Sequence, residues 1–147
     1  MLSIDLNGTK IGDAVLESIG QNIPNLQNLQ LVGTSITDQS LKVIAEFKHL
    51  RTLAISSCRR LSPEATRKLA SCQNLESLIF QDLNLANDDL LFLKQLENLS
   101  SLTVGSNSFD EAALKTIEFL ALRWVNIDGM KHLDQQELQR VNDSINQ

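Results

Sequence analysis

Apolar residues recur along the chain in the pattern L-x-x-L-x-L, and each copy is followed by a polar turn and a second apolar run. Residues 26–49 (LQNLQLVGTSITDQSLKVIAEFKH) show this pattern most clearly. The alternating L-x-L positions predict a short strand with one buried face. Thr37 and Asp38 then offer side-chain oxygens to the free N–H groups of a helix start. Apolar residues follow at helical spacing, namely Leu41, Ile44 and Phe47. Each unit therefore predicts a strand, a turn and a helix of roughly two to three turns.

Six copies of this pattern begin near residues 1, 26, 50, 75, 99 and 122, at intervals of 23 to 25 residues. Such regular spacing indicates a repeat protein, in which each unit buries its apolar stripe by stacking against its neighbours. The strongest predicted helix start is Ser62-Pro63-Glu64, which combines an N-cap, a proline at the first helical position and an acid in the first turn. The strand positions expected to face the core are Met1, Ile4 and Leu6; Leu26, Leu29 and Leu31; Leu50, Leu53 and Ile55; Leu75, Leu78 and Phe80; Leu99, Leu102 and Val104; and Leu122, Val125 and Ile127.

The third copy, LRTLAISSCRRLSPEATRKLASCQN, carries both cysteines of the chain, Cys58 and Cys72. On these repeats, residues 1–127 resemble the leucine-rich repeat family, and the third copy is similar to its cysteine-containing subclass. That subclass is typical of the substrate-binding part of F-box proteins. The Ile36-Thr37-Asp38 segment fits the same subclass and also fits bacterial repeats of similar length. The other copies depart from both, because the positions equivalent to Cys58 are occupied by Thr9, Thr34, Leu83, Asn107 and Met130.

The resemblance implies an α/β fold, a curved leucine-rich-repeat solenoid of about six repeats with a parallel sheet on the concave face and helices on the convex face. Residues 1–147 are expected to form this one domain, in keeping with the length of the chain. Residues from about 129 to 147 are expected to form a C-terminal cap, because Asp134 and Glu137 have the spacing of a capping box. We expect no such element ahead of the first strand, so its parallel edge should be open.

Composition and charge argue against several functional classes. The net charge of −5 opposes nonspecific binding to nucleic acid or to an anionic membrane. The sequence shows neither a transmembrane run nor a signal peptide, which predicts a cytoplasmic location, with delivery into a host cell as the alternative for a bacterial protein. His49 and His132 are far apart, the cysteines suit core packing, and no phosphate-binding glycine motif occurs. We therefore expect no enzyme activity, no cofactor and no metal site.

The side chains that point outward between the buried leucines carry the functional prediction. They are mostly small, neutral and polar. We predict a non-enzymatic protein-interaction module that binds a partner protein through this concave face, as a substrate receptor or a bacterial effector. The predicted partner-binding residues are Asp5, Asn28, Gln30, Val32, Thr52, Ile79, Gln81, Thr103, Trp124, Asn126 and Asp128.

Two questions stay open at this stage. Trp124 is either an exposed anchor, or covered by the C-terminal cap, or turned inward by a one-residue shift of the sixth copy. The alternative function is a structural or assembly subunit. Such a subunit would dock through the open N-terminal strand edge, as a homodimer or in a larger complex, or through its convex helices.

Overall fold

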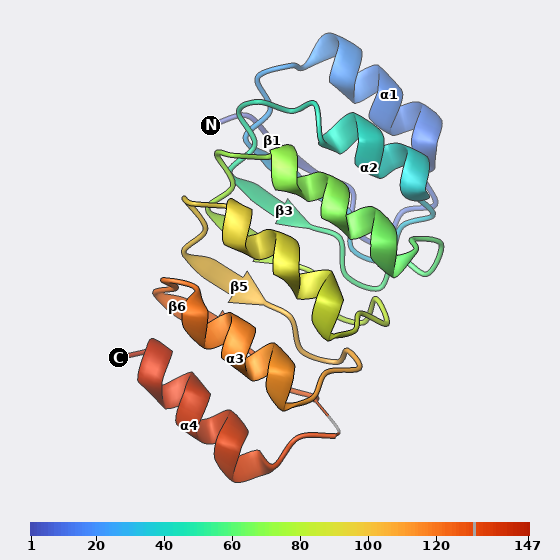
Figure 1. Ribbon diagram of the computed structural model, residues 1–147. Coiled ribbons are helices and arrows are strands. Elements are labelled where there is room, and N and C mark those ends of the chain that lie inside the picture. Colours follow the sequence, from blue (N-terminus) through green and yellow to red (C-terminus); the bar gives the residue numbers. More distant parts are fainter. Residues whose placement is uncertain (131) are drawn as a thin grey trace.

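The computed structural model describes residues 1–130 and 132–147. Within these residues, six strands form one parallel sheet in sequence order, and helical segments cover one face of this sheet (Figure 1). The strands are β1 (Ser3–Asp5), β2 (Asn28–Gln30), β3 (Thr52–Ala54), β4 (Ser77–Ile79), β5 (Ser101–Thr103) and β6 (Trp124–Asn126). The helical segments are α1 (Asp13–Asn22), α2 (Asp38–Ile44), η1 (Pro63–Ser71), η2 (Asn87–Gln95), α3 (Glu111–Phe119) and α4 (Gln135–Ile145).

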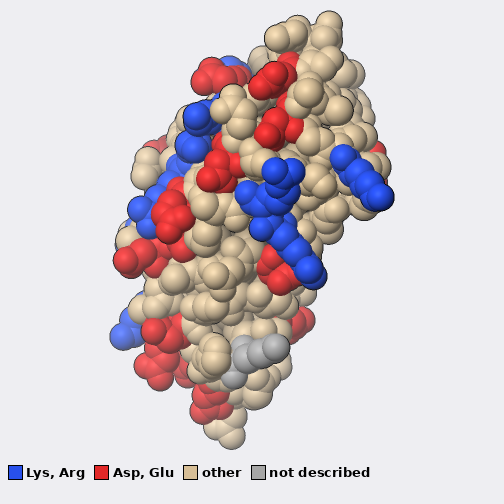
Figure 2. All heavy atoms as spheres, turned by 90° about the vertical axis from the view of Figure 1, so that its right-hand side faces the viewer, with Lys and Arg blue, Asp and Glu red and all other residues tan. Residues whose placement is uncertain are grey.

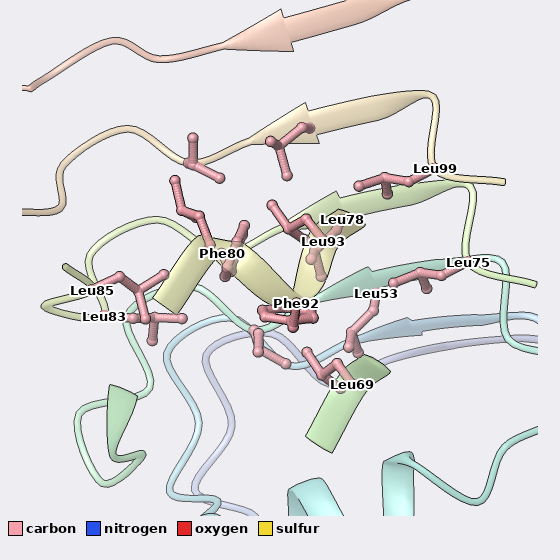
Figure 3. Close-up of a cluster of buried hydrophobic side chains, with 14 of the residues drawn as sticks. Leu53, Leu69, Leu75, Leu78, Phe80, Leu83, Leu85, Phe92, Leu93 and Leu99 are labelled. Atoms are coloured by element: carbon pink, nitrogen blue, oxygen red, sulfur yellow. The ribbon is translucent and has the colours of Figure 1, made fainter. Parts of the chain in front are cut away.

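The strand register agrees with the alignment of the six copies. The central residues of the strands pair in one row across the sheet, from Ile4 through Leu29, Leu53, Leu78 and Leu102 to Val125. All of this row except Ile4 is buried. Figure 3 shows how leucines from neighbouring strands meet side chains from the helical layer, with Phe80 packed edge-on against Phe92 at 6.4 Å between ring centroids. Stacked repeats thus share one continuous core, as the spacing predicts.

The prediction that Met1 faces the core is wrong. Its side chain is 90% exposed, and Ile4 and Leu6 of the same unit are only partly buried. Met1 precedes β1, and the carbonyl of Leu2 already accepts the N–H groups of Gln27 and Asn28. The first unit therefore packs on one neighbour alone, whereas each inner unit packs on two.

Two of the helical segments, η1 and η2, are 3₁₀ rather than α-helices. A 3₁₀ helix has three residues per turn, so side chains three apart lie on one face. Leu90, Leu93 and Leu96 have this spacing and are all buried, which suits the tighter winding of η2. Either helix type can thus cover the sheet in these units, because both present one apolar stripe to it.

Ser62 is the N-cap residue of η1 and Pro63 follows at the first helical position, as predicted, but the Ser62 side chain binds no N–H group of η1. Its hydroxyl instead donates to the Asp38 carboxylate of the preceding unit at 2.7 Å, and its N–H donates to the same carboxylate at 2.8 Å. Asp13 binds Thr37 of the next unit in the same way. The acids at the first helical positions therefore join neighbouring repeats, in addition to favouring their own helix starts.

The hydrogen bonds to Asp13 also change its acidity. Burial raises the pKa of this carboxyl, but hydrogen bonds from Ser40 and Thr37 to the charged form outweigh burial, so the pKa lies below its ordinary value of 3.8. Ser40 reaches Asp13 from α2, so the carboxylate ties α1 to the first turn of the next helix. The ionised form of Asp13 is thus part of the folded structure.

Polar side chains bind backbone groups inside the turns that follow the strands. Thr34 Oγ1 and Cys58 Sγ both donate to the carbonyl of Leu31, at 2.8 and 3.1 Å. Asn107 does more, because its Oδ1 accepts from the N–H groups of Leu83 and Leu85, each at 3.0 Å. Its Nδ2 donates to carbonyls of both the fourth and the fifth unit, Phe80 at 3.1 Å and Val104 at 2.8 Å. Asn107 of the fifth unit thus supplies hydrogen bonds to the fourth unit, whose own residue at the equivalent position, Leu83, has no polar side chain.

The C-terminal helix closes the β6 end of the sheet. The Asp134 carboxylate caps α4 by accepting from the Gln136 N–H at 2.8 Å, but Glu137 binds Arg140 rather than completing a capping box. Lys131, within the predicted cap, lies outside the described residues. In the part of the chain that the structure describes, no helix has the length and apolar character needed to span a membrane.

Candidate interaction surface

Two rows of outward side chains run across the concave face of the sheet. The first row joins Ser3, Asn28, Thr52, Ser77, Ser101 and Trp124. The second row joins Asp5, Gln30, Ala54, Ile79, Thr103 and Asn126. The structure therefore brings eight of the predicted residues onto one surface, namely Asp5, Asn28, Gln30, Thr52, Ile79, Thr103, Trp124 and Asn126.

The end of this surface at β6 is marked by Trp124, which is 44% exposed. Val125 pairs with Leu102 in the inward row and is buried, so the sixth copy keeps the register that turns Trp124 outward. The C-terminal cap approaches β6 at its free edge through Asn146, whose amide binds the backbone of Val125. The cap therefore leaves a large part of the indole available to a partner.

The side chains in the middle of the second row differ in size and in exposure. Ala54 and Thr103 are buried, with Thr103 only 8% exposed, and Ile79 stands between them with more of its side chain exposed. Thr103 lies on the predicted face but offers little surface. Ile79 is thus the apolar side chain that a partner would meet at the centre of the sheet, while Trp124 lies at its end.

The remaining predicted residues, Val32, Gln81 and Asp128, lie just beyond the strand ends. Asn7 orders this border, because its Nδ2 donates to Gln30 Oε1 at 3.0 Å and its Oδ1 accepts from the Val32 N–H at 2.8 Å. Gln81 donates its backbone N–H to Ser56 Oγ at 2.9 Å. Hydrogen bonds between side chains and groups of neighbouring units therefore hold these polar residues in place.

Sequence reasoning missed a polar groove of about 670 Å³ along the edge where the strands end. Its lining is rich in hydroxyl and amide groups and includes one carboxylate, Asp82, and one imidazole, His132. Val32 and Gln81 also line it, so the groove is continuous with the predicted face. The further lining residues are Ser56, Ser57, Asn84, Ser106, Asn107, Ser108 and Gly129.

Four residues of the groove have left-handed backbones without being glycine, namely Ser57, Asp82, Asn84 and Ser106. Ser57, Asp82 and Ser106 have φ of 57°, 53° and 58° and occupy the turn position that Gly8 and Gly33 fill in the first two units. A non-glycine residue in this region costs roughly 1 kcal/mol or more. The loss of glycine at this one position, in adjacent units, is the sequence signal that could have revealed the groove.

Charge is distributed unevenly around this edge. Figure 2 views the side of the molecule toward which the strands point; most of the Lys and Arg side chains lie on its upper half, interspersed with Asp and Glu, which also extend along the left side to the lower end. A separate hollow on this edge is lined by Arg59 and Arg60 together with Ser57, which also lines the groove. A cationic hollow thus borders the groove, whose own charged carboxylate is Asp82.

The cysteines and histidines form no reactive centre in the described residues. Cys58 and Cys72 are buried and unpaired with each other, in agreement with the predicted packing role. Burial raises the pKa of the Cys72 thiol to about 11, although Lys48 opposes the shift, so the thiol is protonated at neutral pH. His49 and His132 are both exposed, and no group of three or more metal-ligating side chains occurs in the part of the chain described.

None of the known protein-family models matches the sequence. A solved structure of similar fold is internalin C2, a leucine-rich-repeat protein from Listeria monocytogenes str. 4b F2365, with a TM-score of 0.63 and 22% sequence identity. The match covers 91% of this chain and 51% of internalin C2, so the chain spans about half the length of that protein. This likeness concerns the fold. Together with the parallel sheet, it shows that the chain forms an α/β leucine-rich-repeat solenoid.

Proposed function

We propose that this protein is a non-enzymatic interaction module that binds a partner protein through its concave sheet. The observation that carries the proposal is the pair of ordered side-chain rows, mostly small and neutral, with Ile79 at the centre and a half-exposed Trp124 at one end. Aromatic side chains of this kind are common anchors in protein interfaces, while small polar neighbours supply hydrogen bonds at little steric cost.

The groove at the strand ends extends this surface. Its hydroxyl and amide groups suit hydrogen bonding to the backbone of a partner segment, and Asp82 suits a cationic side chain. Backbone strain at Ser57 and Ser106 supports a binding role, since left-handed non-glycine residues concentrate at functional sites. We therefore expect a partner that places apolar side chains on Ile79 and Trp124 and a polar segment along the groove.

A narrower form of the proposal makes the protein a substrate receptor or a bacterial effector, located in the cytoplasm or delivered into a host cell. The fold of internalin C2, a bacterial protein, supports the bacterial version. The cysteine pattern of the third copy, with Cys58 and Cys72 buried, supports the version that resembles the substrate-binding part of F-box proteins.

The test compares two charge substitutions of similar size on opposite faces. Ile79→Arg alters the centre of the concave sheet, whereas Leu91→Arg alters an exposed leucine on η2. Tagged wild type and both variants are used to capture binding proteins from native lysate, and the captured proteins are quantified by mass spectrometry after circular dichroism confirms that all three are folded. We expect one set of proteins to be retained by Leu91→Arg and lost by Ile79→Arg. Retention by Ile79→Arg and loss by Leu91→Arg would move the interface to the convex face.

A further inference from the structure

The turn after β3 is longer than its counterparts in four other units. From the last inward strand residue to the next apolar residue, the chain advances six positions in the third unit, from Ile55 to Leu61, and five in the first, second, fourth and fifth units. The extra residue is an arginine, so Arg59 and Arg60 together take the place of Ser35 in the second unit. The N–H of Ser35 donates to a carbonyl of the first unit at 3.1 Å, whereas within the described residues neither arginine makes such a backbone bond. The longer turn therefore places two adjacent arginine side chains at the surface.

The charges of these two arginines are not balanced by carboxylates of the protein. Both side chains are exposed, and in the described part of the chain neither forms an ion pair, whereas Arg51, Arg67 and Arg140 each bind a glutamate or an aspartate. Adjacent like charges repel each other, and a bound anion would relieve this repulsion. The chain as a whole carries a net charge of −5, so a local excess of positive charge does not follow from its composition.

Arg59 and Arg60 line a hollow of about 370 Å³ between the turns of the second and third units. None of its described lining residues is acidic, and the other members are Gly33, Thr34, Ser35 and Ser57. Two of the three hydroxyls, those of Thr34 and Ser57, already donate to protein oxygens at 2.8 and 3.0 Å. The hydroxyl of Ser35 binds no other described residue, so it can donate to a ligand together with the guanidinium groups. Hydrogen-bond donors and positive charge thus meet in one hollow, which is the chemistry of an anion site.

The hollow is continuous with the groove at the strand ends, because Ser57 lines both. Toward the sixth unit, His132 lines the groove and also a third hollow of about 510 Å³. Four carboxylate side chains line that hollow, namely Asp110, Glu111, Asp134 and Glu137. A segment in the groove would therefore meet positive charge beside the third unit and negative charge beside the fifth unit and the C-terminal cap. Its anionic part would be attracted at one end and repelled at the other.

We propose that the hollow of Arg59 and Arg60 binds two neighbouring carboxylate side chains of an acidic segment in the partner protein, with the rest of that segment lying along the groove. This inference rests on the function proposed above, which places a partner segment in the groove. Each guanidinium presents a planar fork of N–H donors that matches the two oxygens of a carboxylate, so two adjacent arginines suit two acids that lie close together. A long polyanion such as nucleic acid would extend beyond the hollow and meet the net negative charge of the chain, whereas a short acidic segment would not.

Selection from a random library of short peptides displayed on phage tests the proposal. The full chain is immobilised as wild type, as the double variant Arg59→Gln/Arg60→Gln and as the control Lys42→Gln/Lys68→Gln. The control also removes two positive charges, but from α2 and η1. We expect neighbouring acidic residues to be enriched among peptides selected on wild type and on the control, and not on the arginine variant. Peptides without neighbouring acids on wild type, or equal enrichment on all three proteins, would overturn the proposal.

Fluorescence polarisation with one selected acidic peptide then measures the contribution of its carboxylates. Replacing both acids of the peptide by their amides should raise the dissociation constant for wild type by more than about tenfold, and for Arg59→Gln/Arg60→Gln by less than about twofold. The measurement on wild type holds even if the arginine variant fails to fold. An equal loss on both proteins would refute the role of the arginines, and tighter binding of a single-stranded oligonucleotide than of the peptide would overturn the choice of an acidic segment.

The variant Ile79→Arg separates this inference from the function on which it rests. If the dependence on peptide acids persists and Ile79→Arg leaves the affinity unchanged, the hollow is supported and the concave sheet is not part of the interface. If Ile79→Arg weakens binding and the dependence on peptide acids is absent, the concave sheet is supported and the role of the hollow is refuted.

Discussion

The buried amide of Asn107 offers the sharpest test of how the repeats are held together. It provides the acceptor for two buried N–H groups, those of Leu83 and Leu85, and donates to three carbonyls. Leucine is the residue found at the equivalent position of the fourth unit, so Asn107→Leu keeps a similar volume and removes every one of these bonds. The substitution therefore isolates the polar contribution of the side chain from its packing.

The expected loss of stability is large. A buried donor left unpaired costs about 1–3 kcal/mol, so two such donors give about 2–6 kcal/mol. Thr34→Val is the matched control, because it removes one hydroxyl whose acceptor, the Leu31 carbonyl, still receives Cys58 Sγ at 3.1 Å. One replaceable neutral hydrogen bond contributes about 1 kcal/mol or less. Asn107→Leu should thus cost at least about twice as much as Thr34→Val.

Urea unfolding followed by circular dichroism gives both free energies of unfolding. Fluorescence of Trp124, the single tryptophan, reports separately on unfolding at the β6 end. If the fluorescence transition occurs at a different urea concentration from the circular dichroism transition, the substitution has uncoupled unfolding of the last units from that of the others. An Asn107→Leu variant that loses under about 1 kcal/mol, or no more than Thr34→Val, would refute the role assigned to this amide.

Four further substitutions probe other parts of the structure. Asp13→Asn should lower the free energy of unfolding at neutral pH, and its difference from wild type should narrow as pH falls below 3.8, because the pKa of Asp13 is lowered on folding and its stabilising charge is lost on protonation. Urea titrations at several pH values measure this difference. A difference that stays constant with pH would contradict the claim. Gly105→Ala should destabilise by about 1–3 kcal/mol or more in thermal unfolding, because the new Cβ would lie 1.8 Å from the Asp128 carbonyl oxygen; an unchanged melting temperature would show that β6 shifts freely. Ser106→Gly should stabilise by about 0.5–1 kcal/mol by relieving a left-handed backbone, whereas Gly33→Ala should destabilise by about 1 kcal/mol, and equal signs in urea unfolding would contradict the strain argument.

The leucine spacing was sufficient to predict the strands, their parallel order and the outward face, because a repeated period leaves one way to stack the units. The register of the sixth copy was ambiguous in the sequence, since Trp124 and Val125 both suit a core. The structure resolves it through the pairing of Val125 with Leu102. Local periodicity was thus sufficient to locate the repeats, whereas the strand register of the last unit is determined by its contacts with the fifth unit.

What the sequence could not supply were contacts between units. Ser62 has the residue type of an N-cap, but the Asp38 carboxylate of the preceding unit lies within hydrogen-bond distance and competes for its hydroxyl. Thr103 has the position of a surface residue, but it lies between Ile79 and Asn126 in the row and is only 8% exposed. The groove arises from turns of several units placed side by side, so no single stretch of sequence describes it.

The central claim is that the concave sheet binds a partner protein, and site-specific photo-crosslinking tests it most directly. A photoreactive amino acid is placed at Gln30 on the sheet and, in a separate variant, at Leu91 on the convex face. Irradiation in native lysate should yield a defined cross-linked product from position 30 that disappears when Trp124→Ala is added, with no such product from position 91. A defined product from position 91 alone, or one from position 30 that survives Trp124→Ala undiminished, would contradict the account.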